Sequence, residues 1–524
     1  MEKQGLGIDR PVFAVAAGIS VAFVLGGVLF QDELATVVAD ILSWVLANLG
    51  WLFVLSTAGF LVLVVFLAVT SYGRIRLGRD DDRPEFRTVS WIAMMFSAGM
   101  GIGLMFFGVA EPISHLAAPP LGSAKPNTEA AAATAMEWTY FHWALHPWAL
   151  YAIVGLALGY FCFRRGMPNL ISSVFHPLLG DRVNGPIGKG IDILAIFATM
   201  FGSATSLGLG ALQINSGLNF VWDVETSTGL AVVIIAVLTL LFVVSAVSGV
   251  ERGVQWLSNF NMLVAVGLLL FILLVGPTVF ILGTLVSGTG DYFGGLFGRS
   301  FQTGVFGGSE WLGSWTFFYW MWWISWTPFV GTFLARISKG RTIREFVIGV
   351  LLVPSGVSFV WFAILGGTAI NLQLTGEANL IDAVAEPEVA LFTLLEQFPI
   401  SAVTSFVVIV LVAVFFVSGA DAASIVMGML TCHGRLEPPR ALVAFWGSAM
   451  GGVAITLLLA GGLDTLQQAA IVAGAPFALV MIGLAFSFFK ALRQEELPAV
   501  EPRATVTIAE PAAPRPRPGT APGS

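Results

Sequence analysis

The sequence predicts an all-α polytopic membrane protein with twelve transmembrane helices. Apolar residues make up 56% of the 524 residues and charged residues only 11%, whereas soluble domains carry charge at about a quarter of their positions. The apolar residues gather into long runs, and nearly all Lys and Arg residues fall on one side of the arrangement that these runs imply. Lipid is therefore the expected solvent for most of the chain.

The same composition excludes a soluble enzyme, a secreted mini-protein and a disordered protein as descriptions of the whole chain. A net charge of −7 argues against nucleic acid as a partner. Cys162 and Cys432 form no CxxC motif and the five His residues form no HExxH pair, so no cofactor is expected.

Each predicted span meets the need for ~20 mostly apolar residues. The first is not interpreted as a cleaved signal peptide, because it has no obvious small-residue cleavage site and further spans follow. The twelve segments lie at 11–30, 50–72, 89–112, 137–162, 190–212, 228–249, 259–284, 314–335, 346–370, 398–430, 441–461 and 466–489.

The distribution of basic residues sets the orientation. With the N-terminus inside, 23 of the 25 Lys and Arg residues fall on inside segments, and only Lys125 and Arg299 fall outside. Because basic residues accumulate on the cytoplasmic side, we expect a multi-pass protein of the plasma (inner) membrane with both termini in the cytoplasm.

Three regions are expected along the chain. A cytoplasmic arm at 1–10 precedes the membrane domain at 11–490, and a Pro-rich cytoplasmic tail at 491–524 follows it. Such a tail is expected to be disordered. It is interpreted either as a solvated end or as a regulatory arm.

Two spans carry helix breakers. The third contains Gly99, Gly101 and Gly103, which weaken a helix by ~1 kcal/mol each and can free carbonyl groups to face a ligand. The eighth contains Pro328 after a run of Trp residues. Interrupted backbone in a bilayer is tolerated where it is buried or lines a cavity, although the glycines could also serve close helix packing.

The positions of these spans suggest an internal repeat. Each opens a set of five helices, spans 3–7 and spans 8–12, and an odd number of crossings inserts the second set upside down relative to the first. An inverted pair of repeats that begin with broken helices is typical of a transporter with its binding site near the middle of the membrane.

Aromatic residues in the fourth span supply a candidate binding group. Trp143, Trp148 and Tyr151 share one side of an ideal helix and could face one cavity together with Trp326. Several π faces around one space suit a quaternary ammonium ion, which has a positive charge, apolar methyl groups and no N–H group to satisfy. The alternative is that these rings face lipid or pack in the core.

At these residues the chain resembles a known family. The stretch 99–108, followed by Glu111 and Pro112, resembles the third-helix signature of the betaine/carnitine/choline transporter family, and its form is similar to that of the sodium-coupled glycine betaine branch. The segment 142–151 resembles the fourth helix of that family, and 315–344 is very similar to its eighth helix and the following loop.

The resemblance covers roughly 10–490. It implies a leucine-transporter-like fold, with two extra helices before the inverted repeats, and a homotrimer. It also implies a secondary active transporter that imports an onium compatible solute, above all glycine betaine, by alternating access. Choline, carnitine and dimethylsulfoniopropionate remain open as substrates, as do proton coupling and exchange.

The resemblance also assigns residues to the site. It places the substrate in an aromatic box and lines the adjoining pathway with further aromatic rings and with the backbone of the glycine stretch. The box residues are Trp143, Trp148, Tyr151 and Trp326, and the adjoining residues are Trp322, Trp323, Phe329, Gly99, Met100, Gly101 and Gly103.

Sodium is the expected coupling ion. Thr199 and Ser203 match the two fifth-helix hydroxyl groups of one sodium site in the family, with Phe329 nearby. Sodium-independent carnitine antiporters carry an Arg in that helix, whereas residues 190–220 here contain no Lys or Arg.

A second sodium site in the family uses carbonyl groups of the glycine stretch and two hydroxyl groups of the tenth helix. The matching residues are Ala98, Met100 and Ser418, but Gly419 stands where the second hydroxyl group is expected. The resemblance therefore favours at least one sodium ion and leaves the second open.

The predicted spans contain the acidic residues Asp421 and Glu111. Asp421 is interpreted as half of a structural pair or as a proton-coupling group, and Glu111 as a structural or gating residue. A membrane-embedded enzyme is disfavoured because the spans offer no convergent nucleophile, base or metal cluster, and substrate accumulation against a gradient would exclude a channel.

Overall fold

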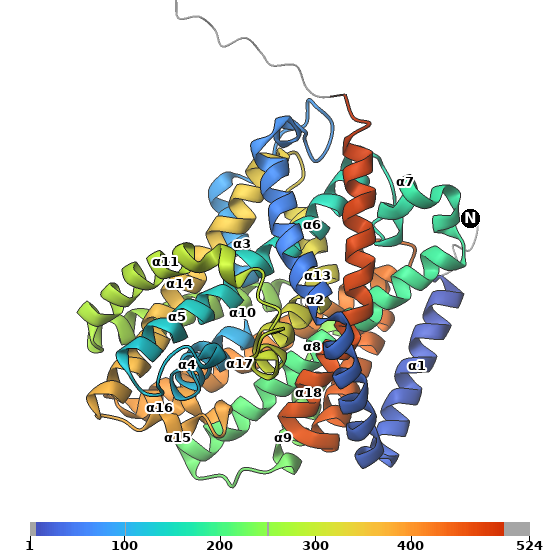
Figure 1. Ribbon diagram of the computed structural model, residues 1–524. Helices are drawn as coiled ribbons and strands as arrows, with labels where there is room; N and C mark the ends of the chain where they lie inside the picture. The colour runs from blue at the N-terminus through green and yellow to red at the C-terminus, as the bar shows by residue number, and fades with distance from the viewer. Residues whose placement is uncertain (1–6, 100, 249–250, 497–524) are drawn as a thin grey trace, which may run out of the picture.

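The computed structural model describes residues 7–99, 101–248 and 251–496, and this part of the chain is helical and contains no β-strand (Figure 1). Within these residues, nine helices are long and apolar enough to cross a membrane, and a bent pair makes ten. The all-α polytopic class is therefore confirmed, while the number of twelve spans remains a prediction. The tail beyond residue 496 lies outside the described residues.

The first two helices precede the rest of the bundle. α1 (Arg10–Leu29) is capped by Asp9, whose side chain accepts a hydrogen bond from the backbone N–H group of Val12. Asp9 also forms an ion pair with Lys189 at 2.9 Å. α2 (Gln31–Val69) begins well before the predicted start at residue 50. Asp32 and Glu33 in its first turn favour that start because they complement the positive end of the helix dipole.

The third span is broken as predicted. α3 (Thr88–Gly99) ends at the first glycine of the stretch, and α4 (Ile102–Ala117) begins before the last, so the break lies within the glycine stretch. Gly101 caps α4 in an extended conformation, with φ −171° and ψ −176°.

The fourth span is also divided. α5 (Glu129–Trp143) and α6 (Leu145–Gly159) meet at Ala144, and a π-helical turn (Tyr160–Arg164) follows. The fifth and sixth predicted spans fall on α8 (Pro186–Trp222) and α9 (Thr228–Ser248).

The seventh predicted segment, 259–284, is not one straight helix. α10 (Glu251–Val275) ends just before Gly276, and the chain bends by 110° into α11 (Thr278–Arg299). The physical reason is Pro277, which has no N–H group to continue the helix and restricts the residue before it.

The prediction that the eighth span is interrupted at Pro328 was wrong. A short helix α12 (Ser309–Leu312) and a π-helical turn (Gly313–Phe317) lead into α13 (Phe318–Ile337), which runs through Pro328 without a break. The hydroxyl group of Thr327 donates to the carbonyl oxygen of Ile324 at 2.7 Å. It thereby satisfies the carbonyl group that Pro328, four residues on, cannot reach.

The remaining spans follow in order. α14 (Ile343–Thr375) begins with a capping box formed by Thr342 and Glu345. α18 (Arg440–Leu492) spans both of the last two predicted segments. Non-helical backbone at Gly461 and Gly462 divides it into two helices that correspond to these segments. Gly462 has a φ of 65°, a conformation that favours glycine. Between them lie α15 (Leu380–Ala383), α16 (Ala390–Glu396) and α17 (Ser401–Leu430).

Short helical turns make several connections. They lie at Ser71–Arg74, Pro120–Gly122, Ser172–Phe175, His176–Leu179 (α7), Gly180–Asn184 and Pro387–Val389. α8 packs against α17 and α18, and α13 packs against α6, α8 and α18. These helices form the centre of the molecule (Figure 1).

One end of the molecule gathers charged connections. Arg164 binds Asp80 and Glu495, each at 2.6 Å, and thereby joins the residues after α18 to the loop before α3. The hydrogen bond from Arg164 lowers the pKa of Asp80. Burial raises the pKa of Glu495, but hydrogen bonds from Tyr160 and Arg164 outweigh it and leave the pKa below its usual value.

Candidate binding site

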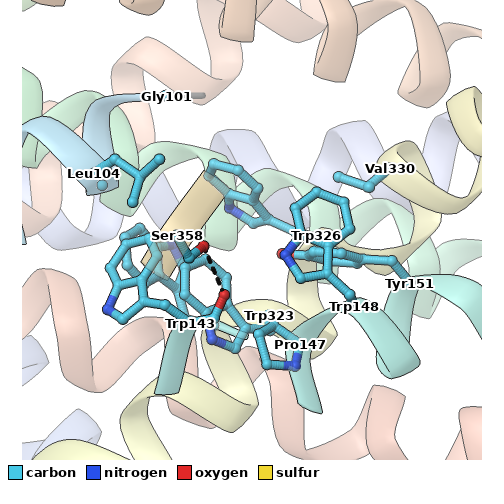
Figure 2. Close-up of a pocket in the computed structure, with 12 residues that line it drawn as sticks. Gly101, Leu104, Trp143, Pro147, Trp148, Tyr151, Trp323, Trp326, Val330 and Ser358 are labelled. Atoms are coloured by element: carbon cyan, nitrogen blue, oxygen red, sulfur yellow. Dashed lines mark hydrogen bonds between the residues drawn. The ribbon is translucent and has the colours of Figure 1, made fainter. Parts of the chain in front are cut away.

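A small cavity of about 40 Å³ lies among α4, α5, α6, α13 and α14, and aromatic rings form most of its wall (Figure 2). Figure 2 shows Trp143 at one end of the group and Trp148 with Tyr151 at the other, with Gly101 apart from the rings. The lining residues are Gly101, Gly103, Leu104, Trp143, Pro147, Trp148, Tyr151, Trp322, Trp323, Trp326, Val330 and Ser358.

Hydrogen bonds hold four indole rings by their edges. The N–H groups of Trp322 and Trp326 both donate to the carbonyl oxygen of Gly202, at 3.2 and 3.0 Å. Trp323 donates to the carbonyl oxygen of His142 at 3.0 Å, and Trp143 donates to the Glu111 carboxyl group at 2.6 Å. The N–H edges are therefore satisfied by protein groups. Trp322 and Trp323 stack on each other, with ring centroids 4.7 Å apart, whereas Trp326 meets both of them edge to face.

Gly103 allows two of the rings to approach each other. A Cβ atom at this position would lie 2.9 Å from the Cη2 atoms of both Trp143 and Trp322. Real Cβ atoms do not approach a ring that closely, so any larger residue would displace one of the two rings.

A larger cavity of about 510 Å³ adjoins the first, and Gly101, Trp326 and Val330 line both. It extends between α8, α13 and α17 as far as Arg336, close to the end of α13. Arg336 forms an ion pair with Glu85 in the loop before α3. The larger cavity therefore leads from the aromatic rings toward the end of the molecule that carries the Arg164 network.

The structure brings most of the predicted substrate residues together. Gly101, Gly103 and the six predicted residues Trp143, Trp148, Tyr151, Trp322, Trp323 and Trp326 line the small cavity. Phe329 lies instead on the larger cavity. Gly99 ends α3, and Met100 lies outside the described residues.

The residues predicted for sodium are placed less uniformly. Ser203, Ser418 and Gly419 line the larger cavity together with Phe329. The buried hydroxyl group of Ser203 has no hydrogen-bond partner, whereas the hydroxyl group of Thr199 is buried and donates to Ala195 at 2.9 Å. The side chain of Ala98 lies outside the described residues.

Sequence reasoning missed four residues of the small cavity. Leu104 and Pro147 lie inside the very motifs that were singled out, so their position along the helix was a usable signal. Val330 likewise lies inside the segment 315–344. Ser358 gave no sequence signal, and its hydroxyl group donates to the carbonyl oxygen of Trp143 at 2.9 Å (Figure 2).

An aromatic cavity that adjoins a larger one, inside an all-helical membrane chain, is typical of membrane transporters. The model of the betaine/carnitine/choline family of transporters matches residues 11–497, and the chain belongs to this family. This membership shows a transporter rather than an enzyme.

Curated relatives agree over nearly their full length. The chain is 45% identical to a probable glycine betaine transporter of Desulfitobacterium hafniense, over 94% of this chain and 100% of the relative. It is 46% identical to the glycine betaine transporter OpuD of Bacillus subtilis, over 92% and 94%. A glycine betaine/proline/choline transporter of Vibrio parahaemolyticus is 41% identical, over 94% and 91%.

Proposed function

We propose that this protein imports glycine betaine, or a closely related onium solute, as a sodium-coupled secondary transporter. The observation that carries the proposal is the small cavity. Its wall presents aromatic faces, and among the described residues that line it none is an acid. A quaternary ammonium group needs no hydrogen-bond acceptor, and a desolvated cation gains ~2 kcal/mol or more from aromatic faces.

The relatives support betaine within this class. All three are named for glycine betaine, and one of them also for choline and proline. The box recognises the cationic group that betaine and choline share, so the names of the relatives favour betaine where the rings alone do not choose.

The two cavities suit alternating access. Phe107 packs against Trp143 and Tyr319, with ring centroids 6.2 and 5.5 Å apart, and none of these three rings lines the larger cavity. These rings close one route, while Trp326 and Val330 border the other. We propose that the larger cavity is the cytoplasmic exit and that both termini lie on that side.

The proposed architecture retains twelve spans. The ten candidate spans become twelve if α13 is counted and α18 is divided at Gly461 and Gly462. We propose two inverted sets, spans 3–7 and 8–12, in a homotrimer of the plasma membrane. The break before α4 supports the first set, and the π-helical turn before α13 is the corresponding irregularity in the second.

Sodium coupling is proposed from the hydroxyl groups that border the larger cavity. The unpartnered hydroxyl oxygen of Ser203 is an oxygen ligand of the kind that a hard cation prefers. Ser418 lies on the same cavity. Sodium would be cargo here, moving together with the solute.

The test is uptake into proteoliposomes that contain the purified protein. Labelled glycine betaine, choline, carnitine and dimethylsulfoniopropionate are offered with a sodium gradient and in potassium buffer at the same pH. We expect betaine to accumulate only with the gradient. Equal uptake in potassium buffer would refute sodium coupling, and an absence of onium uptake under any gradient would refute the proposed substrate class.

A further inference from the structure

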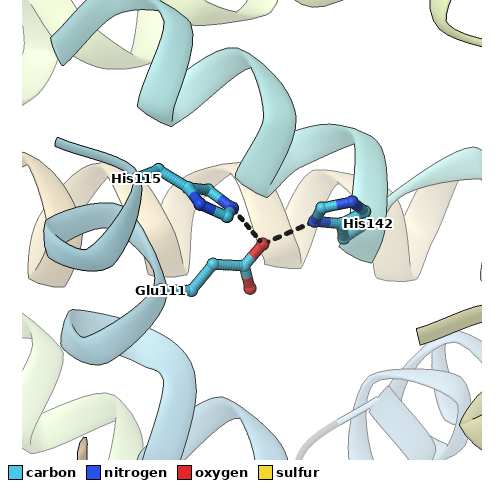
Figure 3. Close-up of side chains that lie close together, drawn as sticks. All are labelled: Glu111, His115 and His142. Atoms are coloured by element: carbon cyan, nitrogen blue, oxygen red, sulfur yellow. Dashed lines mark hydrogen bonds and ion pairs between the residues drawn. The ribbon is translucent and has the colours of Figure 1, made fainter. Parts of the chain in front are cut away.

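Glu111 lies directly behind one ring of the box. It is fully buried in α4, and its Oε2 atom accepts hydrogen bonds from the indole N–H of Trp143 at 2.6 Å and from the hydroxyl group of Tyr319 at 2.5 Å. Its Oε1 atom faces two rings, His142 Nδ1 at 2.7 Å and His115 Nε2 at 3.3 Å (Figure 3). Four polar groups thus converge on one carboxyl group.

The contacts suit an ionised carboxylate. An indole N–H can only donate, so Oε2 accepts from Trp143, and an ionised Oε2 can also accept from the Tyr319 hydroxyl group. His115 Nδ1 is buried without a partner, and an unpaired N–H is costlier there than an unpaired acceptor. The proton of His115 therefore belongs on Nε2, pointing at Oε1. His142 Nε2 lies 3.0 Å from the hydroxyl group of Thr316, which can donate to it. Its Nδ1 is then the second donor to Oε1.

The positions of two rings of the box depend on Glu111 and the side chains bound to it. Trp143 is held through its own N–H group, and Trp323 donates to the backbone carbonyl of His142, whose side chain is bound to Glu111. A charge-assisted hydrogen bond is about twice as strong as a neutral one. It also pushes electron density from the N–H into the indole ring, which makes the π face more attractive to a cation.

We propose that Glu111 is a positioning residue of the aromatic box, and that its carboxylate strengthens onium binding from behind Trp143 without touching the ligand. The inference rests on the proposed function. None of the described residues that line the cavity is acidic, yet the expected ligand carries a positive charge. The Glu111 carboxylate supplies the opposite charge from the far side of the Trp143 ring, in a dry site, where charges act over longer distances than in water.

The decisive measurement is glycine betaine binding by calorimetry to the intact protein in lipid nanodiscs. Glu111→Gln keeps the size of the side chain, and its amide oxygen can still accept from Trp143, but the charge is lost. We expect Kd to rise about tenfold, which corresponds to about 1.4 kcal/mol. Glu310→Gln makes the same chemical change at an exposed residue of α12 and serves as the matched control.

A double-mutant cycle tests whether the charge acts through the ring. Trp143→Phe keeps a π face but removes the N–H group, and we expect it to raise Kd about tenfold. The double variant with Glu111→Gln should be little weaker than either single variant. An additive, hundredfold loss would overturn the route through Trp143.

Tyr319→Phe separates charge from hydrogen bonding. It removes one donor to the same Oε2 atom and leaves the carboxylate charged, so we expect a loss of threefold or less. A loss as large as that of Glu111→Gln would overturn the role of the charge. If Glu111→Gln does not fold, an unchanged Kd in Trp143→Phe would overturn the inference by itself.

Three other outcomes are distinguishable. One ligand atom each of Glu111, His115 and His142 lies within 4.8 Å of the others, a spacing that could hold a metal ion. A transition metal that copurifies one to one, and is lost in Glu111→Gln, would overturn the free carboxylate. If the parent protein binds no onium, the proposed function fails. If the parent and Glu111→Gln bind betaine equally, only this inference fails.

Discussion

Replacing Trp326 with Ala should weaken onium binding about thirtyfold. Trp326 lines both cavities, and its ring centroid lies 5.7 Å from that of Trp322 and 6.1 Å from that of Trp323. Removing this π face forfeits ~2 kcal/mol of attraction to a desolvated cation, which is about thirtyfold in Kd. The expected result is a higher Kd for glycine betaine with a nearly unchanged thermal midpoint.

Calorimetry on the protein in lipid nanodiscs measures the Kd for glycine betaine. Two further variants are measured for comparison with Trp326→Ala. Trp326→Phe keeps a smaller π face but loses the hydrogen bond to Gly202, so an intermediate Kd is expected. Trp44→Ala removes an indole that is 60% exposed on the surface of α2 and should leave Kd unchanged. A Kd for Trp326→Ala within twofold of the parent would refute the assignment of this ring to the box.

Four further substitutions test other parts of the molecule. Gly202→Ala would place a Cβ atom in close conflict with the side chain of Ser325 and 2.9 Å from Trp326 Cδ1, so we expect a loss of ~1–3 kcal/mol in stability and weaker betaine binding; an unchanged thermal midpoint would contradict this. Ser203→Ala should raise the sodium concentration for half-maximal uptake, whereas Gly419→Ser, which has open space for a Cβ atom, should lower it; opposite shifts would refute the proposed sodium ligands. Arg164→Gln should lower the thermal midpoint at neutral pH. Because the pKa of Asp80 is lowered in the folded protein, its contribution is present above the ordinary value of 3.8 and is lost as pH falls through the lowered value. The difference between parent and variant should therefore shrink below about pH 4, and a difference that grows there would contradict this reasoning.

Hydropathy predicted where the helices lie, but local backbone chemistry decided how they run. The break before Ile102 followed from glycines in the sequence. The bend at Pro277 could have been predicted by the same rule, because Gly276 and Pro277 stand inside the segment assigned to one span. The rule that proline interrupts a helix failed at Pro328, because the hydroxyl group of Thr327 satisfies the carbonyl group of Ile324 that proline leaves free.

The aromatic cavity was predictable in part because its rings repeat along two helices. Trp143, Trp148 and Tyr151 were expected on one face of a single helix; they do line one cavity, although the break at Ala144 puts Trp143 in α5 and the other two in α6. The Trp run of α13 was conspicuous. The partners of those rings were not predictable, since the carbonyl oxygen of Gly202 belongs to a helix far along the chain and leaves no mark on composition. Periodicity reports which face a side chain occupies, but not which distant backbone atom it meets.

The shared carbonyl oxygen of Gly202 has a consequence for how this site can diverge. Two indole rings are fastened to a main-chain atom, and no single amino-acid substitution can delete a main-chain oxygen. Substitutions that remove side-chain hydrogen-bond partners therefore leave the hydrogen bonds that hold Trp322 and Trp326 intact. Changes in ligand preference should then arise first at Trp148 and Tyr151, which makes α6 the natural target for engineering a transporter of a different solute.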